Sequence, residues 1–263
     1  MSTSRYSFQD LSDFVDHLTE ASREVIAQYF RHPINIDAKD DESPVTIADR
    51  ETERSLRKLI NERFPDHGIF GEEFGQENVD SQYVWVLDPI DGTRSFITGT
   101  PTFGTLISLL EDGDPVLGVI DMPAMDERWI GDGKSGTRVN GQKCSVSQRE
   151  QLNGCRLAST SPDMFSAEQL VNFKKLLGRT SFYRYGGDCY NYALLASGHI
   201  DLVVESDLQL YDFSALVPVV EGAGGVITDW QGQPLTMQSK GDVVAAASLA
   251  LHSQAIELLK TAG

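Results

Sequence analysis

The sequence predicts a layered protein of the α/β class, and three observations carry this prediction. Two helical patterns open the chain, a group of mostly antiparallel strand patterns follows, and from about residue 150 short strands alternate with helices. Alternation of this kind places helices on both sides of a sheet. The 263 residues contain no repeat and no flexible linker, so we expect one domain (1–263) with an N-terminal half (1–150) and a C-terminal half (151–263).

The first half is expected to hold two helices and then a sheet. Apolar residues recur at helical spacing from Ser7 to Phe30, and again from Val45 until Pro65 ends the second helix. The period then changes, and Asn140-Gly141 signals a tight hairpin turn. The predicted strands are 69–73, 83–88, 103–110, 116–121 and 128–130.

The second half is expected to alternate strands and helices. The predicted strands are 156–158, 181–184, 202–205, 226–228 and 243–247. The predicted helices are 167–177, 188–197, 212–223 and 249–261, and Gly198 stops the second of them.

Composition narrows the classes of function. The formal net charge of −17 argues against nucleic acid as a partner, because nucleic-acid binding needs a basic surface. It does not argue against a phosphorylated substrate if metal ions supply positive charge. Three cysteines without a CxxC pattern fit a reducing compartment. The polar N-terminus lacks the pattern of a signal peptide, and no segment has membrane-spanning length, so we expect a soluble cytoplasmic protein without a membrane partner.

The stretch from Trp85 to Thr93 holds the most informative residues. An apolar run, typical of a buried strand, leads into Asp88, and Asp91 follows three positions later. Pro89 and Gly92 are expected to form a turn that ends the strand. Two carboxylates this close repel each other, so one takes up a proton unless a cation lies between them. The alternative is a solvated, Asp-rich turn that caps the next helix.

Other acids also lie at the ends of predicted elements, namely Asp49, Glu72-Glu73 and Asp212. Mg²⁺ prefers oxygen ligands, and two such ions about 4 Å apart can clamp both oxygens of a phosphoryl displacement. These acids with Asp88 and Asp91 are a sensible ligand set. Alternatively, Asp49 and Asp212 are ordinary helix N-caps and Glu72-Glu73 is a solvated acidic turn.

Two glycine-containing turns are candidates for phosphate and substrate binding. Gly92 and Thr93 stand where a strand gives way to a helix, and free backbone N–H groups at such a start bind phosphate. Thr93 is alternatively a plain capping threonine. Gly187 and Asp188 precede another predicted helix, and Glu205 ends a strand, so these residues are candidates for a substrate pocket. The alternative is a tight turn and a surface acid.

Several familiar motifs fail. A P-loop is excluded because Arg128 stands where a glycine is required, and the glycines at 222–225 lack dinucleotide-binding spacing. The five histidines show no zinc-site spacing. Spacing alone leaves a Ser-His-Asp triad open, although no G-x-S-x-G sequence is present.

Four motifs occur in one order along nearly the whole chain. They are Ser43 to Asp49, Gly71-Glu72-Glu73, Asp88-Pro89-Ile90-Asp91-Gly92-Thr93, and Tyr211-Asp212 with Gly222 to Gly225 and Thr228-Asp229. Together they resemble the inositol monophosphatase-like, metal-dependent phosphatases. The sequence Arg94-Ser95-Phe96, with Tyr185 to Cys189 and Asp201 to Glu205, is most similar to the histidinol-phosphate phosphatase branch. Tyr211 replaces a usual Trp, and Thr100 stands where a Lys is common.

The resemblance implies a fold and a set of roles. The fold would be the α/β/α/β/α sandwich of the inositol monophosphatase and fructose-bisphosphatase type, commonly a homodimer. Two to three Mg²⁺ ions would bind: one at Glu72, Asp88 and the Ile90 carbonyl, a second at Asp88, Asp91 and Asp212, and a weaker third near Glu72. Thr93 and Asp49, with Glu72, would activate water. Phosphate or substrate would contact Gly92, Thr93, Arg94, Gly187, Asp188, Glu205 and Asp212.

The expected function is a Mg²⁺-dependent phosphomonoesterase. It would hydrolyse L-histidinol phosphate to L-histidinol and phosphate, a step of histidine biosynthesis, by in-line attack of a metal-activated water. Histidinol carries a protonated amine, which Asp188 and Glu205 would favour through charge-assisted hydrogen bonds. The alternatives are an inositol monophosphatase or broad-specificity sugar phosphatase on the same scaffold, and a catalytically silent metal-binding regulatory protein.

Overall fold

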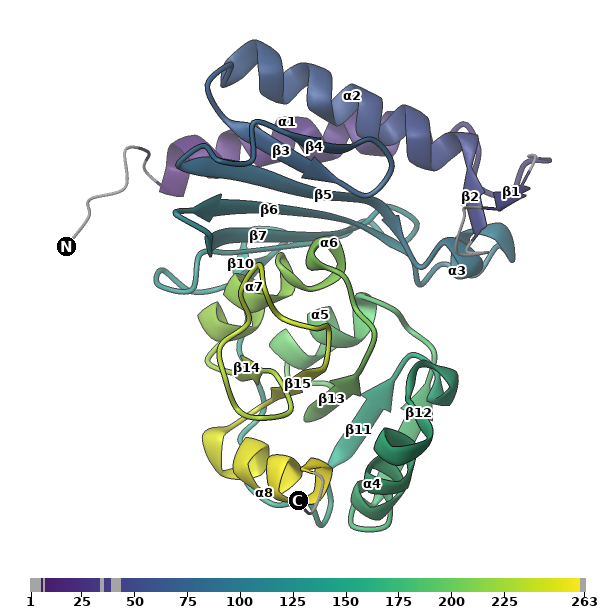
Figure 1. The fold of residues 1–263 in the computed structure, drawn as a ribbon, viewed down its shortest axis with the longest axis vertical. Coiled ribbons are helices and arrows are strands. Elements are labelled where there is room, and N and C mark those ends of the chain that lie inside the picture. Colours follow the sequence, from purple (N-terminus) through teal and green to yellow (C-terminus); the bar gives the residue numbers. More distant parts are fainter. Residues whose placement is uncertain (1–5, 7, 34–35, 39–43, 261–263) are drawn as a thin grey trace.

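The structure is a stack of two β-sheets with helices between and outside them (Figure 1). This computed structural model describes residues 6, 8–33, 36–38 and 44–260. The larger sheet has the strand order β10-β9-β8-β7-β6-β5-β3-β4, and the smaller sheet has the order β12-β11-β13-β15-β14.

The larger sheet is antiparallel except where β3 pairs with β5. Its strands are β3 (Gly68–Gly71), β4 (Gly75–Glu77), β5 (Tyr83–Asp91), β6 (Gly104–Glu111), β7 (Asp114–Met122), β8 (Glu127–Gly131), β9 (Arg138–Val139) and β10 (Gln142–Lys143). The predicted β6–β7 hairpin is confirmed. So is the turn at Asn140-Gly141, whose φ angles of 47° and 79° suit a two-residue hairpin loop.

The smaller sheet is mixed. Its strands are β11 (Arg156–Ser159), β12 (Phe182–Tyr185), β13 (Leu202–Glu205), β14 (Val226–Thr228) and β15 (Val243–Ala246). β11 pairs in parallel with both β12 and β13, whereas β15 is antiparallel to β13 and β14. The carboxyl ends of β11 and β13 therefore meet at one edge of the sheet, which faces the site described below.

Helices complete five layers. They are α1 (Phe8–Ile26), α2 (Ile47–Arg63), α3 (Thr93–Ile97), α4 (Ala167–Leu177), α5 (Tyr190–Ala196), α6 (Leu210–Phe213), α7 (Leu216–Gly222) and α8 (Leu249–Leu259), with a 3₁₀ turn at Pro162–Met164 and a hairpin of β1 (Ile36–Ala38) and β2 (Pro44–Thr46). In Figure 1, α1 and α2 cover the larger sheet, α5 to α7 lie between the sheets, and α4 and α8 cover the smaller sheet. The predicted α/β/α/β/α layering is confirmed.

Apolar side chains fill the layers on both sides of the larger sheet. Trp85 of β5 is fully buried under α1, and its ring centroid lies 5.6 Å from that of Phe14. Its indole N–H donates to Nδ1 of His67 at 3.1 Å, which satisfies the polar atom of a buried ring. Between the sheets, Leu106 belongs to the same hydrophobic cluster as Val203. A neighbouring cluster holds strand β5 and helix α6 next to each other, because Val84 and Val86 of β5 pack with Leu210 and Tyr211.

Some elements differ from the prediction. Strand β5 does not end at Pro89 but continues to Asp91. The single helix predicted over 212–223 is two helices, α6 and α7, and the first begins at Leu210. Helix α1 ends at Ile26 and gives way to turns. The short strands β1, β2 and β4 carry too little periodic signal to be predicted, and most of the polar segment expected at 39–44 lies outside the described residues.

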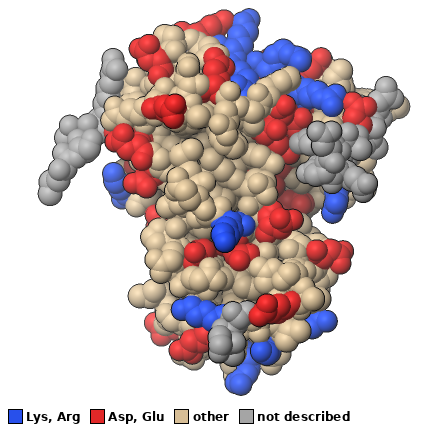
Figure 2. Space-filling view, viewed as in Figure 1, with Lys and Arg blue, Asp and Glu red and all other residues tan. Residues whose placement is uncertain are grey.

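Charged groups of both signs are interspersed on the face shown in Figure 2. Acidic side chains are spread across that face, and basic ones gather mainly toward its upper and lower ends. Within the described ranges, no helix combines the length and the apolarity needed to cross a bilayer.

Candidate active site

An irregularity in β5 brings two acids to one side of the sheet. Opposite strand β6, Asp88 pairs with Leu106 while Asp91 pairs with Gly104, so the register shifts between the two acids. In a regular strand, residues three apart point to opposite faces, and an extra residue on one strand reverses that relation. Pro89 has no N–H, and Oδ1 of Asp88 accepts the N–H of Ile90 at 3.0 Å. The Asp-Pro-Ile-Asp order therefore builds a bulge.

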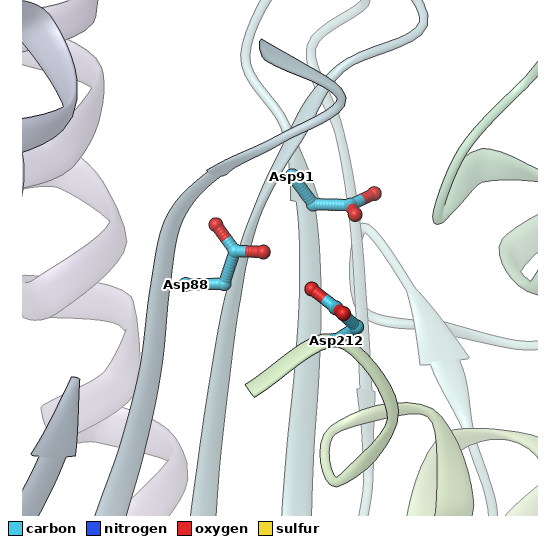
Figure 3. A group of neighbouring side chains, drawn as sticks. All are labelled: Asp88, Asp91 and Asp212. Carbon is cyan, nitrogen blue, oxygen red and sulfur yellow. The ribbon is translucent and has the colours of Figure 1, made fainter. Parts of the chain in front are cut away.

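Asp212 completes a group of three carboxylates. One oxygen each of Asp88, Asp91 and Asp212 lies within 4.8 Å of the others. In Figure 3 the side chains from β5 and from α6 point toward one another. Burial raises the pKa of Asp88 well above its ordinary value, and the charge of Glu72 is the next largest cause. Burial likewise raises the pKa of Asp91 well above its ordinary value and raises the pKa of Asp212 to about 7.

Capping interactions fix the orientation of Asp49 and Asp212. Both stand at the third helical position, not at the N-cap: the N-caps are Thr46 and Gln209. Oδ2 of Asp49 accepts the N–H of Thr46 at 2.9 Å, and Oδ2 of Asp212 accepts the N–H of Gln209 at 2.6 Å. In each case the cap holds one oxygen and leaves the other for the site, so the alternative of an ordinary N-cap is wrong for both.

Thr93 links Asp49 to the bulge. Its hydroxyl lies 3.2 Å from the carbonyl oxygen of Ile90 and 3.4 Å from Oδ1 of Asp49. Burial raises the pKa of Asp49, against the hydrogen bonds from Thr46 that lower it. A hydroxyl with two acceptors in reach and a lone pair to spare can accept a proton donor on its other side and pass a proton on.

Glu72 lies beside Asp88. Its backbone N–H donates to the carbonyl of Leu87 at 3.1 Å, which ties the end of β3 to β5 one residue before Asp88. The charge of Glu72 contributes to raising the pKa of Asp88, Asp49 and Asp212, so its carboxylate lies within electrostatic range of all three. The structure thus brings Glu72 to the carboxylate group that the sequence predicted it would join.

A small cavity of about 110 Å³ opens next to the three carboxylates. Asp91, Asp188, Glu205 and Asp212 are among the residues that line it. Oδ2 of Asp188 accepts the hydroxyl of Ser95 at 2.7 Å, and burial raises the pKa of Asp188. Glu205 is only 2% exposed, and burial raises its pKa to about 7. Asp188 and Glu205, the two acids predicted for a substrate pocket, therefore line the same cavity.

The remaining predicted residues surround this cavity. Gly92 has φ 81°, and a Cβ there would approach the side chain of Asp188 to 2.8 Å. Gly187, with φ 124°, leaves room for Asn191. Arg94 is exposed, and its charge lowers the pKa of Asp188, so it lies on the rim. Helix α5 begins at Tyr190, two residues later than predicted, because Asp188 is in the left-handed region with φ 47°.

Sequence reasoning missed the two residues that hold Glu205. Thr160 donates to Oε1 through its N–H at 2.9 Å and its hydroxyl at 2.6 Å. The hydroxyl of Tyr192 donates to Oε2 at 2.9 Å. Thr160 could have been found, because it directly follows β11 just as Glu205 ends β13, and parallel neighbours end at the same edge. Tyr192 carries no comparable signal.

Comparison with known proteins assigns the chain to a family. The model of the inositol monophosphatase family matches residues 10–263. This chain belongs to the inositol monophosphatase family. It is therefore a phosphatase of a metal-dependent family that generally uses Mg²⁺.

Relatives within the family carry different names. A bifunctional phosphatase IMPL2, chloroplastic, of Arabidopsis thaliana is 49% identical over 92% of this chain and 73% of its own length. A histidinol-phosphatase of Mycobacterium tuberculosis is 33% identical over 95% of both chains. An inositol monophosphatase structure from Zymomonas mobilis is 45% identical, with a TM-score of 0.89 over 98% of this chain and 100% of that one.

The donor set fits a hard divalent cation. All three members of the group that the described residues form are carboxylates, whose oxygens Mg²⁺ prefers over sulfur or imidazole ligands. Burial and mutual repulsion raise the pKa of its members, so a cation between them would remove a large electrostatic cost.

Proposed function

We propose that this phosphatase hydrolyses L-histidinol phosphate to L-histidinol and phosphate with two to three Mg²⁺ ions. The observation that carries the choice of alcohol is the acidic cavity beside the carboxylate group. A protonated amine gains charge-assisted hydrogen bonds from Asp188 and Glu205, whereas a neutral polyol gains ordinary ones. Histidinol-phosphatases among the relatives, including one of Chlorobaculum parvum at 35% identity, support the same choice.

Each predicted site residue has a role in this proposal. One ion would be held by Glu72, Asp88 and the Ile90 carbonyl, a second by Asp88, Asp91 and Asp212, and a third near Glu72. When bound, Mg²⁺ supplies the positive charge that phosphate and the departing alkoxide need.

The protein's own groups bind phosphate and move the proton. The N–H groups of Gly92 and Thr93, with Arg94 at the rim, bind the phosphate oxygens. Thr93 accepts a hydrogen bond from the attacking water and passes the proton toward Asp49, whose raised pKa suits a base.

The two acids that line the cavity, Asp188 and Glu205, can each accept a further hydrogen bond. Three hydrogen bonds reach Glu205, two on Oε1 and one on Oε2, and a carboxylate offers about four acceptor positions. Oδ1 of Asp188 accepts no hydrogen bond from the described part of the chain. An ammonium group between the two acids would use both positions, and Gly187, which leaves room for Asn191, would shape the turn that carries Asp188.

A panel of phosphate monoesters tests the proposal. Turnover of L-histidinol phosphate and of inositol 1-phosphate is compared at equal Mg²⁺, with release of phosphate as the readout. We expect a higher kcat/KM for histidinol phosphate. A clear preference for the inositol ester would overturn the choice of alcohol, and no release from any ester would favour a silent metal-binding protein.

Inositol phosphate or a broad range of sugar phosphates is the second candidate. The 45% identity to the Zymomonas mobilis inositol monophosphatase favours it, as does the word bifunctional in the name of the Arabidopsis thaliana relative. A neutral hydroxyl group would donate to Glu205 in the same cavity, so only the charge of the alcohol separates the two candidates.

We also propose that the chain is one cytoplasmic domain that acts as a homodimer. Strand β12 is the edge of the smaller sheet, and Phe182, Tyr183 and Tyr185 on it are 38–58% exposed. Exposed aromatic residues on a strand that pairs on one side only within the described ranges favour a second copy as their cover. Light scattering of the wild type and of a Tyr183→Ser variant tests this proposal: a wild-type monomer would refute it.

A further inference from the structure

Helix α2 buries an acid that the proposed chemistry does not use. Glu53 lies one helical turn beyond Asp49, on the face whose other members include Leu56 and Ile60, and it is 0% exposed. A fully buried glutamate among aliphatic residues is rare unless it is paired and hydrogen-bonded. Its partners therefore indicate what it is for.

Glu53 is bonded to the loop that carries Glu72. Oε2 of Glu53 accepts the N–H of Glu73 at 2.7 Å, and Oε1 accepts the N–H of Phe74 at 3.1 Å. Arg57 donates from Nε to Oε1 at 2.7 Å and, through its guanidinium, to the carbonyl of Gly75. The carboxylate thus holds the two backbone N–H groups that directly follow Glu72.

The glycine before Glu72 makes this contact possible. A side chain at Gly71 would overlap the carboxylate of Glu53 and approach Arg57 to 2.8 Å. The backbone of Glu72 is consequently fixed on both sides: its own N–H is bound by Leu87 of β5, and the next two residues are bound by Glu53 of α2.

We propose that Glu53 is a positioning residue for Glu72, holding that carboxylate against Asp88 so that the two can share a cation. This inference rests on the proposed function of Glu72. A role limited to fold stability would use the same bonds but would leave the Mg²⁺ affinity unchanged. The pair Lys58–Glu62 on the same helix has the same i,i+4 spacing, but its side chains are 61–74% exposed and 4.0 Å apart. Pairs of that kind contribute little.

Substitution Glu53→Gln keeps the size of the side chain but replaces one acceptor oxygen by an NH₂ donor. The NH₂ group of the glutamine would then lie against the N–H of Glu73 or of Phe74, and since both groups are donors, that hydrogen bond to the loop is lost. We expect Mg²⁺ alone, titrated into substrate-free protein by calorimetry, to bind at least about tenfold more weakly, as for other groups that orient metal ligands. Hydrogen exchange at Glu73 and Phe74 should accelerate.

A double-mutant cycle separates positioning from general damage. If Glu53 acts through Glu72, the loss in Glu53→Gln/Glu72→Gln equals the loss in Glu72→Gln alone. Independent, additive losses would overturn the proposal, and so would wild-type Mg²⁺ affinity in Glu53→Gln. The matched control is Glu62→Gln, an exposed change of the same kind on the same helix, which should bind Mg²⁺ as the wild type does.

A second variant decides the matter if Glu53→Gln does not fold. Glu53→Asp keeps the buried charge for Arg57 but draws the carboxylate back from the two N–H groups, so the same loss of Mg²⁺ affinity is expected, and normal affinity would refute the role. Failure of the proposed function looks different: wild-type protein would bind no Mg²⁺ or release no phosphate, while hydrogen exchange would still report whether Glu53 holds the loop.

Discussion

Glu205→Gln should make the metal-free protein more stable at neutral and alkaline pH. Glu205 is buried, and burial with the nearby charge of Asp188 raises its pKa to about 7, against the hydrogen bonds from Thr160 and Tyr192. Glutamine imitates the protonated acid: its oxygen keeps both bonds from Thr160, and the Tyr192 hydroxyl can rotate to accept from its NH₂.

The size and sign of the effect follow from proton linkage. An acid whose pKa is raised in the folded state binds its proton more tightly when folded, so the free energy of unfolding falls as pH rises from about 4.5 to about 7. The difference between these values corresponds to at most roughly 3 kcal/mol. The advantage of the glutamine variant should therefore be near zero at pH 4.5 and full above pH 7.

Urea unfolding of wild type and variant, in EDTA and at several pH values from 5 to 8, measures this. Glu257→Gln, an exposed change on α8, is the matched control and should show no pH-dependent difference. Equal stability of wild type and Glu205→Gln at pH 8 would refute the reasoning. In the assay for turnover, the same variant should lose about tenfold or more in kcat/KM for histidinol phosphate, because a charge-assisted bond becomes a neutral one.

Three further outcomes are expected. Asp88→Asn should lower turnover by at least about 100-fold with the fold retained in circular dichroism, since it removes the carboxylate shared by two proposed ions; full activity with Mg²⁺ would end the two-metal account. Thr93→Val should lower kcat about 100-fold or more in steady-state assays while calorimetry shows unchanged Mg²⁺ binding, and weakened binding would instead make Thr93 part of the metal site. Trp85→Phe should cost about 1–2 kcal/mol in urea unfolding through loss of its bond to His67, and an unchanged midpoint would show that the bond contributes nothing.

The layering was predictable because strand and helix periods are local. The alternation after residue 150 follows from spacing alone, and helix α4 is observed over the predicted 167–177. The break between α6 and α7 was not predictable, because Phe213 and Leu216 are both buried and continue one apolar pattern through the break. The sequence predicted a turn at Pro89, where the structure has a bulge. A turn and a bulge can both begin with an acid followed by a proline, and only the pairing of β5 with β6 distinguishes one from the other.

Part of the candidate site was likewise predictable from local sequence, and part was not. Acids at element ends were identifiable, since Asp49, Glu72 and Asp212 interrupt apolar patterns. The orientation of these side chains was not predictable, because it depends on which backbone N–H group binds one of the two carboxylate oxygens. For Asp49 and Asp212 this group belongs to the N-cap residue, Thr46 or Gln209, and the sequence does not show where the helix begins. The role of Glu53 was not predictable, because Glu53 and Arg57 have the i,i+4 spacing that is typical of a solvated ion pair on a helix.

The group of Asp88, Asp91 and Asp212 cannot select the alcohol, and this has a physical reason. These carboxylates lie on β5 and at the start of α6, and in the proposed mechanism they would hold the ions that bind the phosphate group, which both candidate substrates share. Selection must come from groups that reach the other side of the ester oxygen, and there the cavity offers Asp188 and Glu205. With the pKa of Glu205 at about 7, a cationic alcohol would draw that residue into its charged form, whereas a neutral polyol would leave it divided between two forms. The dependence of kcat/KM on pH between 6 and 8 therefore carries more information on the substrate than the metal ligands do.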